Sequence, residues 1–487
     1  MRSRVSRTAP ARERVCLWQP QPRQEIFMAR GEDEAFFGGA AGGGKSDVVV
    51  VEALRQVTIP NYKGIIFRKT YRQLGELLEK ADKYYPRAFP GARYNSQQSM
   101  WRFPSGAKVY FAGMQYTKDK VTWQGWQFDY IAFDELTHFQ WEEYSYMMSR
   151  NRASGPGTRV YIRATGNPGG VGHGWVKNRF ITPAPAMTPM KRRIRYIDQD
   201  GEEKERWNTR IFVPSKVQDN RKLLENDPDY IARLAALPRK EREALLEGNW
   251  DSFSGQVFTE WKDDADHYED HLHTHVIAPF RIPDHWRVQM GFDWGYSKPF
   301  ACGWYAYDNE GKQYMIRELY GCTGEPDEGV QWTVPAIAQK IHEIESQDLN
   351  LKGKKIERIG DPAIWQGGGG EGSIGEMFER NRIYFQEGNH ERLSGKMQCH
   401  YRLSIDEDGL TMFQVFNTCR HFIRTIPSLV YSEIDVEDVD TKQEDHLYDQ
   451  WRYCCMTRRI APRIRKKAEK IKADPLNLYS DRVTVSH

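Results

Sequence analysis

The stretch that decides the fold of the first half of the chain is Gly39-Ala-Ala-Gly-Gly-Gly-Lys-Ser46, which matches GxxxxGK followed by Ser or Thr at every fixed position. It follows residues 35–37, which are typical of an apolar strand, and precedes residues 48–54, which are spaced as in a helix. Glycines let backbone N–H groups converge on phosphate oxygens, and the N-terminus of the next helix adds a partial positive charge. A chance glycine-rich turn is the alternative, but the flanking strand and helix supply the context that the pattern requires. The stretch therefore predicts a phosphate-binding loop.

Individual residues of this loop have separate expected roles if it binds ATP. Lys45 would reach the β- and γ-phosphates, and Ser46 would bind the accompanying Mg²⁺. Upstream, Gln24 is a candidate for contacting the adenine base, although a surface glutamine is an equally good interpretation. The glycines expected to cradle the phosphates are Gly39, Gly42, Gly43 and Gly44.

Two later strand patterns, at residues 130–133 and 160–164, are followed by acidic or polar residues that could act together with this loop. Residues 130–135 read Tyr-Ile-Ala-Phe and then Asp134 and Glu135. Mg²⁺ held by Ser46 needs a further hard oxygen ligand, for which Asp134 is suited, and Glu135 is a candidate base for the attacking water. Asn167 ends the following strand and could contact the γ-phosphate, with a plain Gly-Asn-Pro turn as the alternative. Exposed acids end many strands, so these residues alone would be weak evidence for a magnesium site. The phosphate loop upstream is what supports their assignment.

Alternating strand and helix patterns over residues 34–167 predict an α/β fold with a mainly parallel sheet. A second strand-rich unit follows a stretch that is rich in Asp and His and lacks periodicity. The expected organisation is a flexible basic arm at 1–17, a P-loop ATPase domain at 18–250 with a small helical subdomain at about 175–250, a linker at 251–285, a second α/β domain at 286–457 and a basic tail at 458–487.

The second unit carries acids on separated elements. Asp293 lies within a strand pattern, Asp361 ends another, and residues 445–451 read as a helix. In that helix Asp445 and Asp449 are four apart and share a face, with His446 beside them. Each acid alone is more often solvated or a helix cap. Together they can bind two Mg²⁺ or Mn²⁺ ions, which activate water and stabilise the leaving oxygen in phosphodiester cleavage.

One other acid, Glu318, is a rival metal ligand on the strand pattern at residues 314–319. The sequence alone does not choose between Glu318 and the acids of the predicted helix.

Composition excludes several classes of protein. The 70 basic and 67 acidic residues leave a net charge of +3, which is unlike a protein that coats DNA, so DNA contact would need a local basic groove. Seven cysteines without a CxxC pair argue against a disulfide framework or a zinc knuckle and favour a reducing cytoplasm. No apolar run approaches the length of a membrane span, so we expect no membrane partner.

Taken in order, these motifs resemble the large terminase subunit of tailed bacteriophages over roughly residues 18–455. Neither half is specific alone, whereas the combination is. The segments that carry the resemblance are GGAAGGGKS (38–46), IIFRKTY (65–71), YIAFDELTHF (130–139), ATGNPGG (164–170), GFDWGYSKP (291–299), IGDPA (359–363) and DHLYDQWRY (445–453).

The resemblance implies an ATPase of the additional-strand, catalytic-glutamate type followed by an RNase H-like nuclease. It implies a homo-oligomeric ring, expected to be a pentamer, that docks on the portal protein of a procapsid and pumps double-stranded DNA inward. Before assembly, the chain could be a monomer in solution. A small terminase subunit would select viral DNA in the host cytoplasm, and the protein would be absent from the mature virion. The residues carried over are Lys45, Ser46, Asp134, Glu135 and Thr165 to Asn167 for ATP, and Asp293, Asp361 and Asp449, beside Asp445 and His446, for cleavage.

The chain departs from its relatives in one respect. Some relatives carry an arginine finger inside the phosphate loop, where this chain has residues 40–43 without arginine, or before the second carboxylate motif, where it has Thr-Trp-Gln-Gly at 122–125. A ring motor favours supply of the finger from a neighbouring subunit. The open candidates are Arg68, Arg150, Arg152 and Arg163.

Two other functions compete with a packaging motor. An ATP-dependent DNA repair or recombination nuclease would need a second motor domain, for which residues 168–284 leave no space. A nucleotide-gated binding or assembly protein without catalysis would not need Glu135 or the full set of acids. DNA-stimulated ATP hydrolysis and Mn²⁺-dependent nicking, measured together, distinguish these functions.

Overall fold

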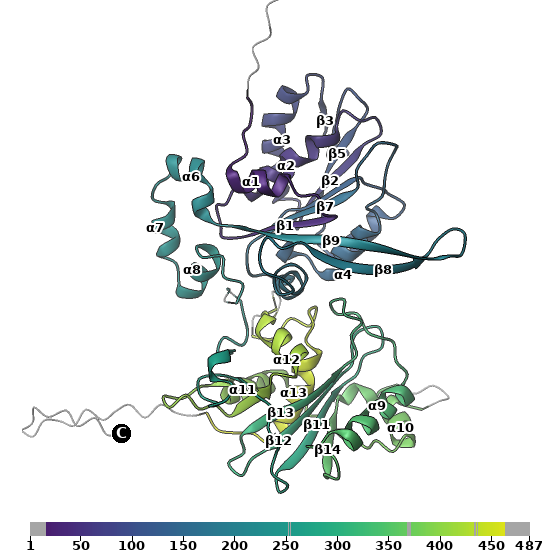
Figure 1. Ribbon diagram of the computed structural model, residues 1–487, viewed down its shortest axis with the longest axis vertical. Helices are drawn as coiled ribbons and strands as arrows, with labels where there is room; N and C mark the ends of the chain where they lie inside the picture. Colours follow the sequence, from purple (N-terminus) through teal and green to yellow (C-terminus); the bar gives the residue numbers. More distant parts are fainter. Residues whose placement is uncertain are drawn as a thin grey trace, which may run out of the picture.

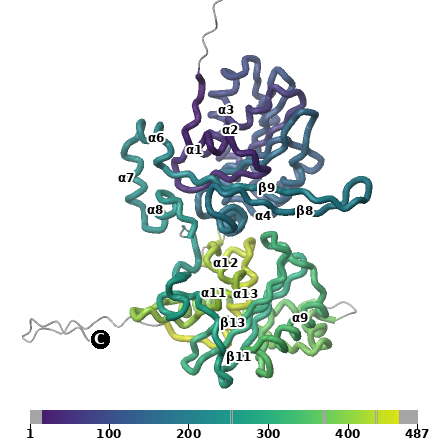
Figure 2. Tube along the Cα trace, viewed as in Figure 1, coloured from purple at the N-terminus to yellow at the C-terminus, as the bar shows by residue number. Residues whose placement is uncertain are grey.

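The structure is a computed structural model that describes residues 16–462, except 252, 254, 368–371, 433–434 and 436. Two α/β domains, each built on its own sheet, lie one above the other along the longest axis (Figure 1 and Figure 2). The predicted basic arm and basic tail fall almost wholly outside the described residues.

The first domain is built on a nine-stranded sheet in the order β3-β4-β5-β2-β6-β7-β1-β9-β8. Its strands from β5 to β9 in this order run parallel, which confirms the predicted mainly parallel sheet. β7 lies between the strand before the phosphate loop, β1, and the strand before Asp134, β6, which is the additional-strand arrangement. The strands are β1 (Glu34–Gly39), β2 (Lys63–Arg68), β3 (Arg93–Asn95), β4 (Met100–Arg102), β5 (Lys108–Gly113), β6 (Tyr130–Phe133), β7 (Tyr161–Gly166), β8 (Met190–Ile197) and β9 (Glu203–Ser215).

Helices cover both faces of this sheet. All residues of β1, β6 and β7 are buried, as expected for parallel strands with a hydrophobic core on each face. Because the carboxyl ends of parallel strands meet at one edge, the polar residues that follow β1, β6 and β7 come together there. The helices of the first half of the domain are α1 (Pro22–Met28), α2 (Lys45–Glu52), α3 (Leu74–Ala88) and α4 (Trp141–Met148).

The region at 175–250 differs from the predicted small helical subdomain. It begins with α5 (His173–Val176) and the π-helical turn η4 (Lys177–Ile181), and continues into the long antiparallel hairpin of β8 and β9. β9 then joins the central sheet beside β1. The hairpin projects sideways from the domain (Figure 1), so both faces of β8 carry exposed charged residues and the strand lacks an apolar alternation. The short helices that do follow are α6 (Arg221–Asn226), α7 (Tyr230–Ala235) and α8 (Arg239–Leu245).

The second domain is built on a seven-stranded sheet in the order β10-β16-β13-β12-β11-β14-β15. β11, β12 and β13 are antiparallel, whereas β14 and β15 lie parallel on the other side of β11, which is the predicted RNase H-like arrangement. The strands are β10 (Val276–Ile277), β11 (Arg287–Asp293), β12 (Ala301–Tyr307), β13 (Gln313–Tyr320), β14 (Ile356–Gly360), β15 (Gln386–Glu387) and β16 (Phe413–Phe416). The helices are α9 (Val334–Gln347), α10 (Ile374–Arg380), α11 (Arg392–Leu403), α12 (Arg420–Thr425) and α13 (His446–Thr457).

The segment predicted as a linker, 251–285, packs on the second domain instead. Val257 and Phe258 are buried in its hydrophobic core, and β10 pairs with β16. The apolar residues of this segment occur in short pairs between Asp and His residues, so they show no periodicity although they are buried.

Candidate nucleotide site and candidate metal site

The predicted phosphate loop connects β1 to α2 and has the backbone that its glycines permit. Gly39, Gly42 and Gly44 have φ values of +136°, +72° and +72°, which favour glycine over other residues. A side chain on Gly43 would place its Cβ 1.9 Å from the Oγ of Ser215, at the end of β9. The Ala40 N–H also donates to the Ser215 carbonyl at 2.8 Å. The loop is therefore packed against β9 as well as between β1 and α2.

The residues expected to bind phosphate and Mg²⁺ lie together at the start of α2. Lys45 is buried, and its ammonium group donates to the Ala40 carbonyl. Burial lowers the pKa of Lys45, although the charges of Glu135 and Asp134 act against this shift. The Ser46 hydroxyl donates to Asp134 Oδ1 at 3.1 Å, so the candidate magnesium ligands on α2 and β6 are in direct contact.

Two further side chains hold Asp134. The Thr165 hydroxyl, on β7, donates to Asp134 Oδ1, and Arg68, at the end of β2, forms an ion pair with Asp134 Oδ2. Asp134 itself is fully buried. A buried carboxylate needs such partners, and all of them come from the ends of neighbouring parallel strands or the start of α2.

Glu135 has a strained backbone and a positioned side chain. Its φ and ψ are 58° and 59°, the left-handed region that residues other than glycine seldom adopt. Its carboxylate accepts hydrogen bonds from the Asn167 backbone N–H at 3.2 Å and from Asn167 Nδ2 at 3.1 Å. Backbone strain of this kind persists where the surroundings enforce it and clusters at functional sites.

The Gln24 side chain is buried rather than on the surface, and its amide is hydrogen-bonded to the phosphate loop. Gln24 Nε2 donates to the Gly44 carbonyl at 2.9 Å, and its Oε1 accepts from the Gln21 N–H at 2.8 Å. Sequence reasoning missed Asn220, whose Nδ2 donates to the Gly42 carbonyl at 2.6 Å. Asn220 lies far along the chain and begins α6, so no local pattern pointed to it.

The four candidate finger arginines have different environments. Arg68 lies in the nucleotide site of its own chain through its ion pair with Asp134. Arg163 is fully buried and donates to the carbonyl groups of Arg30 and Glu32, so it cannot reach a neighbouring subunit. The other two, Arg150 and Arg152, lie at the start of β6, the opposite end of that strand from Asp134.

The predicted nuclease acids lie around the ends of β11 and β14. Asp293 is the last residue of β11, and Asp361 directly follows β14, its parallel neighbour. His446, the first residue of α13, contacts Asp293 with 3.1 Å between Nδ1 and Oδ2. Burial raises the pKa of Asp293 to about 6, and the charges of Asp449 and Asp361 add to this effect although His446 opposes it. The four side chains therefore share one electrostatic environment.

Each acid also has protein partners of its own. Asp361 Oδ1 accepts from the Ala363 N–H at 3.0 Å and from the Tyr453 hydroxyl at 3.2 Å. Asp449 Oδ1 accepts from Arg452 Nε at 2.9 Å. Asp445 is buried at the start of α13, and burial together with the charge of Asp449 raises its pKa.

Within the parts of the chain that the structure describes, no three His, Cys, Asp or Glu side chains are grouped to hold a metal ion. The residues present do fit such an ion chemically, because carboxylate oxygens are the ligands that Mg²⁺ and Mn²⁺ prefer. Asp293, Asp361 and Asp449 thus lie close enough to interact through their charges. That they converge as ligands of one metal centre stays a prediction.

The rival ligand Glu318 has another role. Its carboxylate accepts from the backbone N–H groups of His421 and Phe422 at 2.8 and 3.0 Å, which caps the start of α12. A residue that sequence reasoning missed is Asp327, which contacts His446 with 3.0 Å between Oδ1 and Nε2. Asp327 lies in a loop with φ of 55° and shows no motif, so the sequence offered no signal.

A P-loop domain with an additional strand, joined to an RNase H-like domain, defines the class of protein. A family model described as terminase large subunit, T4likevirus-type, N-terminal matches residues 36–262. The first domain of the chain is therefore similar to the N-terminal domain of terminase large subunits of this type. None of its described helices is long and apolar enough to cross a membrane.

Solved structures give distant similarities. The large terminase of a thermophilic bacteriophage, in complex with ATP-γ-S, is 16% identical, covering 89% of this chain and 98% of that one, with a TM-score of 0.36. The HK97 bacteriophage large terminase is 10% identical, covering 90% and 95%, with a TM-score of 0.44. The P22 large terminase nuclease domain is 19% identical, covering 42% and 93%, with a TM-score of 0.30. No curated protein matches the chain.

Proposed function

We propose that this chain hydrolyses ATP at its phosphate loop to move double-stranded viral DNA into a procapsid, and that it cleaves the DNA at the acids around β11 and β14. The observation that carries the proposal is the contact of Ser46 with Asp134 beside the positioned carboxylate of Glu135. A phosphate loop alone indicates only that a protein binds a nucleotide. A positioned base beside the loop indicates that the nucleotide is also hydrolysed.

In the proposed ATPase reaction, Lys45 and the N–H groups of the loop bind the phosphates of ATP. Ser46 and Asp134 would hold Mg²⁺, which neutralises charge on the β- and γ-phosphates when bound. Glu135 orients the attacking water and accepts its proton. Asn167 keeps the Glu135 carboxylate in place through hydrogen bonds from its backbone N–H and its side-chain amide, so a shift of the loop after β7 would release the base.

We assign the arginine that stabilises charge on the transferred phosphoryl group to Arg68 of the same chain. The assignment is supported by the ion pair that Arg68, at the end of β2, forms with Asp134, the proposed magnesium ligand. Among the four candidates, Arg150 and Arg152 lie at the other end of β6, so these two would be left for supply from a neighbouring subunit.

In the proposed cleavage reaction, Asp293, Asp361 and Asp449 hold the metal ions, with Asp445 and His446 beside them. Two Mg²⁺ or Mn²⁺ ions, when bound, activate water and stabilise the leaving oxygen. Arg452 and Arg392 contact Asp449 and Tyr453 contacts Asp361, so these residues set the orientation of the acids. The proposed partners are double-stranded DNA, the portal protein of the procapsid, a small terminase subunit and further copies of the chain in a pentameric ring.

The experiment that tests this function measures three activities of the purified protein. We expect ATP hydrolysis that DNA stimulates, nicking of plasmid DNA that depends on Mn²⁺ or Mg²⁺, and ATP-dependent packaging into purified empty capsids. Hydrolysis and nicking without packaging would instead support a DNA repair or recombination nuclease. Absence of both hydrolysis and nicking would leave a nucleotide-gated binding protein.

A further inference from the structure

A cavity of about 250 Å³ lies between the two domains and is lined mainly by basic side chains. The ATPase domain contributes three arginines, one from η4 and two from the β8–β9 hairpin, and the second domain contributes residues of α12 and of the loop after β13. A single carboxylate also lines it. The charged and titratable lining residues are Arg179, Arg192, Arg210, Arg424, His421 and Glu325.

Most of the positive charge is already paired, except at one position. Arg179 forms a bidentate pair with Glu34, and Arg424 pairs with Glu444. The Arg210 side chain makes no hydrogen bond or ion pair with any described residue, and its Nε is buried without a partner. An unpaired guanidinium in a partly buried site is costly unless a ligand completes its hydrogen bonds.

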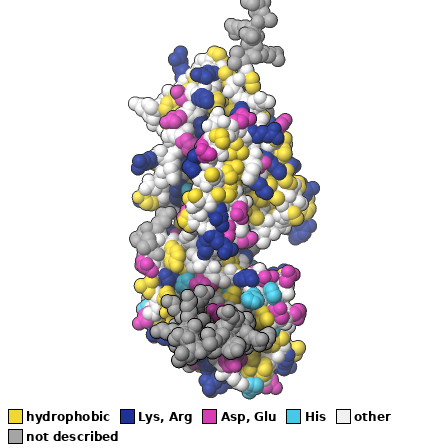
Figure 3. All heavy atoms as spheres, turned by 90° about the vertical axis from the view of Figure 1, so that its left-hand side faces the viewer, with side chains coloured by type: hydrophobic (Ala, Val, Ile, Leu, Met, Phe, Trp, Pro, Cys, Tyr) yellow, Lys and Arg dark blue, Asp and Glu magenta, His cyan; other side chains and the backbone are white. Residues whose placement is uncertain are grey.

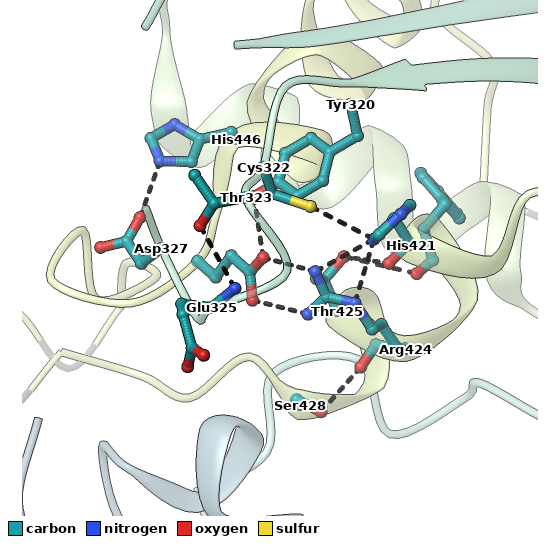
Figure 4. Close-up of polar contacts among 12 residues, drawn as sticks. Tyr320, Cys322, Thr323, Glu325, Asp327, His421, Arg424, Thr425, Ser428 and His446 are labelled. Carbon is teal, nitrogen blue, oxygen red and sulfur yellow. Dashed lines mark hydrogen bonds and ion pairs between the residues drawn. The ribbon is translucent and has the colours of Figure 1, made fainter. Parts of the chain in front are cut away.

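The histidine beside the arginines adds no charge at neutral pH. Burial and the neighbouring Arg424 lower the pKa of His421 to about 4, so its imidazole is neutral. Figure 4 shows His421 and Arg424 side by side on α12, next to the loop that carries Cys322 and Glu325. The arginines therefore set the electrostatic character of the cavity.

Glu325 occupies the place that an external anion would take. Its carboxylate contacts Arg179 Nη1 at 3.5 Å and forms an ion pair with Arg192. The loop has other contacts, because Asp327, two residues further on, lies 3.0 Å from His446 (Figure 4) and also forms an ion pair with Lys298. Glu325 can thus leave the arginines while its loop stays anchored.

We propose that this cavity is a binding site for a phosphate group, with Arg192 and Arg210 as the recognising residues and Glu325 as a built-in competitor. The planar guanidinium group of an arginine can donate two parallel, charge-assisted hydrogen bonds to two oxygens of one phosphate group. The volume lies below the range of roughly 300–1,000 Å³ that whole small-molecule ligands occupy, which suits one phosphate of a longer chain or a small free phosphate. Neither ATP hydrolysis nor DNA cleavage requires this site, so it can be tested apart from both.

The first test compares binding by Arg210→Gln with a matched control, Arg206→Gln. Arg206 lies on the same strand but is exposed, pairs with Asp33 and does not line the cavity. Anisotropy of a short labelled DNA duplex is measured at several salt concentrations, in EDTA and without nucleotide. We expect Arg210→Gln to weaken binding by at least about tenfold and to reduce the salt dependence by about one phosphate contact, and Arg206→Gln to match wild type.

The second test removes the competitor. Glu325→Gln should tighten binding of the same probe, and this gain should be lost in the double variant with Arg210→Gln. Inorganic pyrophosphate at constant ionic strength is the second probe, measured by the shift in melting temperature. A duplex effect without a pyrophosphate effect assigns the site to the DNA backbone, and the reverse assigns it to free phosphate.

Two results would overturn the proposal. One is equal binding of both probes by Arg210→Gln and Arg206→Gln, and the other is a Glu325→Gln variant that binds neither probe more tightly than wild type. Melting temperatures of each variant without ligand establish that the comparison is made between folded proteins. If Arg210→Gln does not fold, Arg210→Lys replaces it. Lysine keeps the positive charge but lacks the paired N–H donors of the guanidinium group, which the proposed site requires.

Discussion

The candidate nucleotide site and the candidate metal site differ in how completely the protein assembles them. Around Asp134, the contacting groups come from α2, β2 and β7 and already touch one another. Around Asp293, the acids share an electrostatic environment, but Asp361 and Asp449 direct their oxygens to other protein groups. The first site therefore needs only its ligand, whereas in the second a metal ion must compete with existing hydrogen bonds.

This difference has a physical origin in charge. The candidate nucleotide site has Lys45 and Arg68 beside its two acids, so its charges are balanced without a ligand. The candidate metal site has four carboxylates and one histidine in a shared electrostatic environment, and burial raises the pKa of Asp293. Like charges in a buried site repel unless cations join them. Full assembly of the second site should therefore accompany metal binding.

Charge on one face of the molecule is dispersed. On the face shown in Figure 3, Lys and Arg side chains alternate with Asp and Glu over both domains rather than forming one basic strip. This agrees with the small net charge of +3. A contact of this face with DNA would therefore depend on local clusters of basic side chains.

The largest expected effect separates the two sites completely. Lys45→Ala should abolish ATP hydrolysis, because the loop loses the charge that binds the β- and γ-phosphates, while Mn²⁺-dependent nicking continues. Phosphate release and plasmid relaxation are measured on the same preparation. Lys204→Ala, on β9, is a suitable control because it removes an ion-paired lysine whose partners, Asp198 and Glu202, lie in the turn of the same hairpin. Unchanged ATP turnover in Lys45→Ala would refute the assignment of the loop.

The reciprocal substitution acts on the metal site. Asp361→Asn or Asp293→Asn should reduce nicking below detection and leave ATP turnover intact, because an amide keeps the shape but loses the charge that metal ions need. Asp445→Asn and Asp449→Asn then show which acid of α13 takes part. If Asp445→Asn abolishes nicking and Asp449→Asn does not, the assignment of Asp449 is wrong.

The arginine assignment gives the next largest effect. Arg68→Ala should slow ATP hydrolysis by roughly 10³–10⁵, with specific activity independent of protein concentration. Mixing Arg68→Ala with Glu135→Gln subunits should restore nothing, because every site still lacks either the base or the arginine. Recovery of activity in the mixture would show that the finger comes from the neighbouring subunit.

A smaller effect is expected from the base. Glu135→Gln should slow hydrolysis by roughly 10²–10⁴ while ATP still binds, because the phosphates are held by Lys45 and the loop. Nucleotide affinity is measured by titration with a fluorescent ATP analogue and turnover by phosphate release. Equal loss of affinity and turnover would mean that Glu135 has a structural role.

The smallest effect concerns the residue that holds the base. Asn167→Ala removes the side-chain hydrogen bond to Glu135 and keeps the backbone one, so kcat should fall by roughly 10–100-fold with little change in KM. Asn167→Asp, which places a second negative charge beside Glu135, should be at least as slow. A change confined to KM would indicate that Asn167 contacts nucleotide rather than the base.

Sequence reasoning found the residues that follow strands and missed those that come from loops. Asp134, Asn167 and Asp361 each follow a parallel strand, and parallel strands bring their carboxyl ends to one edge, so their neighbourhood was predictable. Asn220 and Asp327 reach their sites from irregular segments, whose paths depend on tertiary packing.

The same limit explains the errors in the fold. The β8–β9 hairpin is charged on both faces because it projects from the domain, so it lacked the alternation that marks a strand. Residues 257–282 pack on the second core in short apolar pairs, which resemble a linker in sequence. The central strands of the first sheet, such as β2 and β6, carry short apolar runs, and these were predictable.

The most direct test of the central claim is the amount of linear DNA that becomes protected from added nuclease inside purified empty capsids. Our account predicts ATP-dependent protection by wild type, equal protection by Asp361→Asn because precut DNA needs no further cleavage, and none by Lys45→Ala. Absence of protection by wild type, despite rapid ATP turnover stimulated by DNA, would contradict the assignment of this chain as a packaging motor.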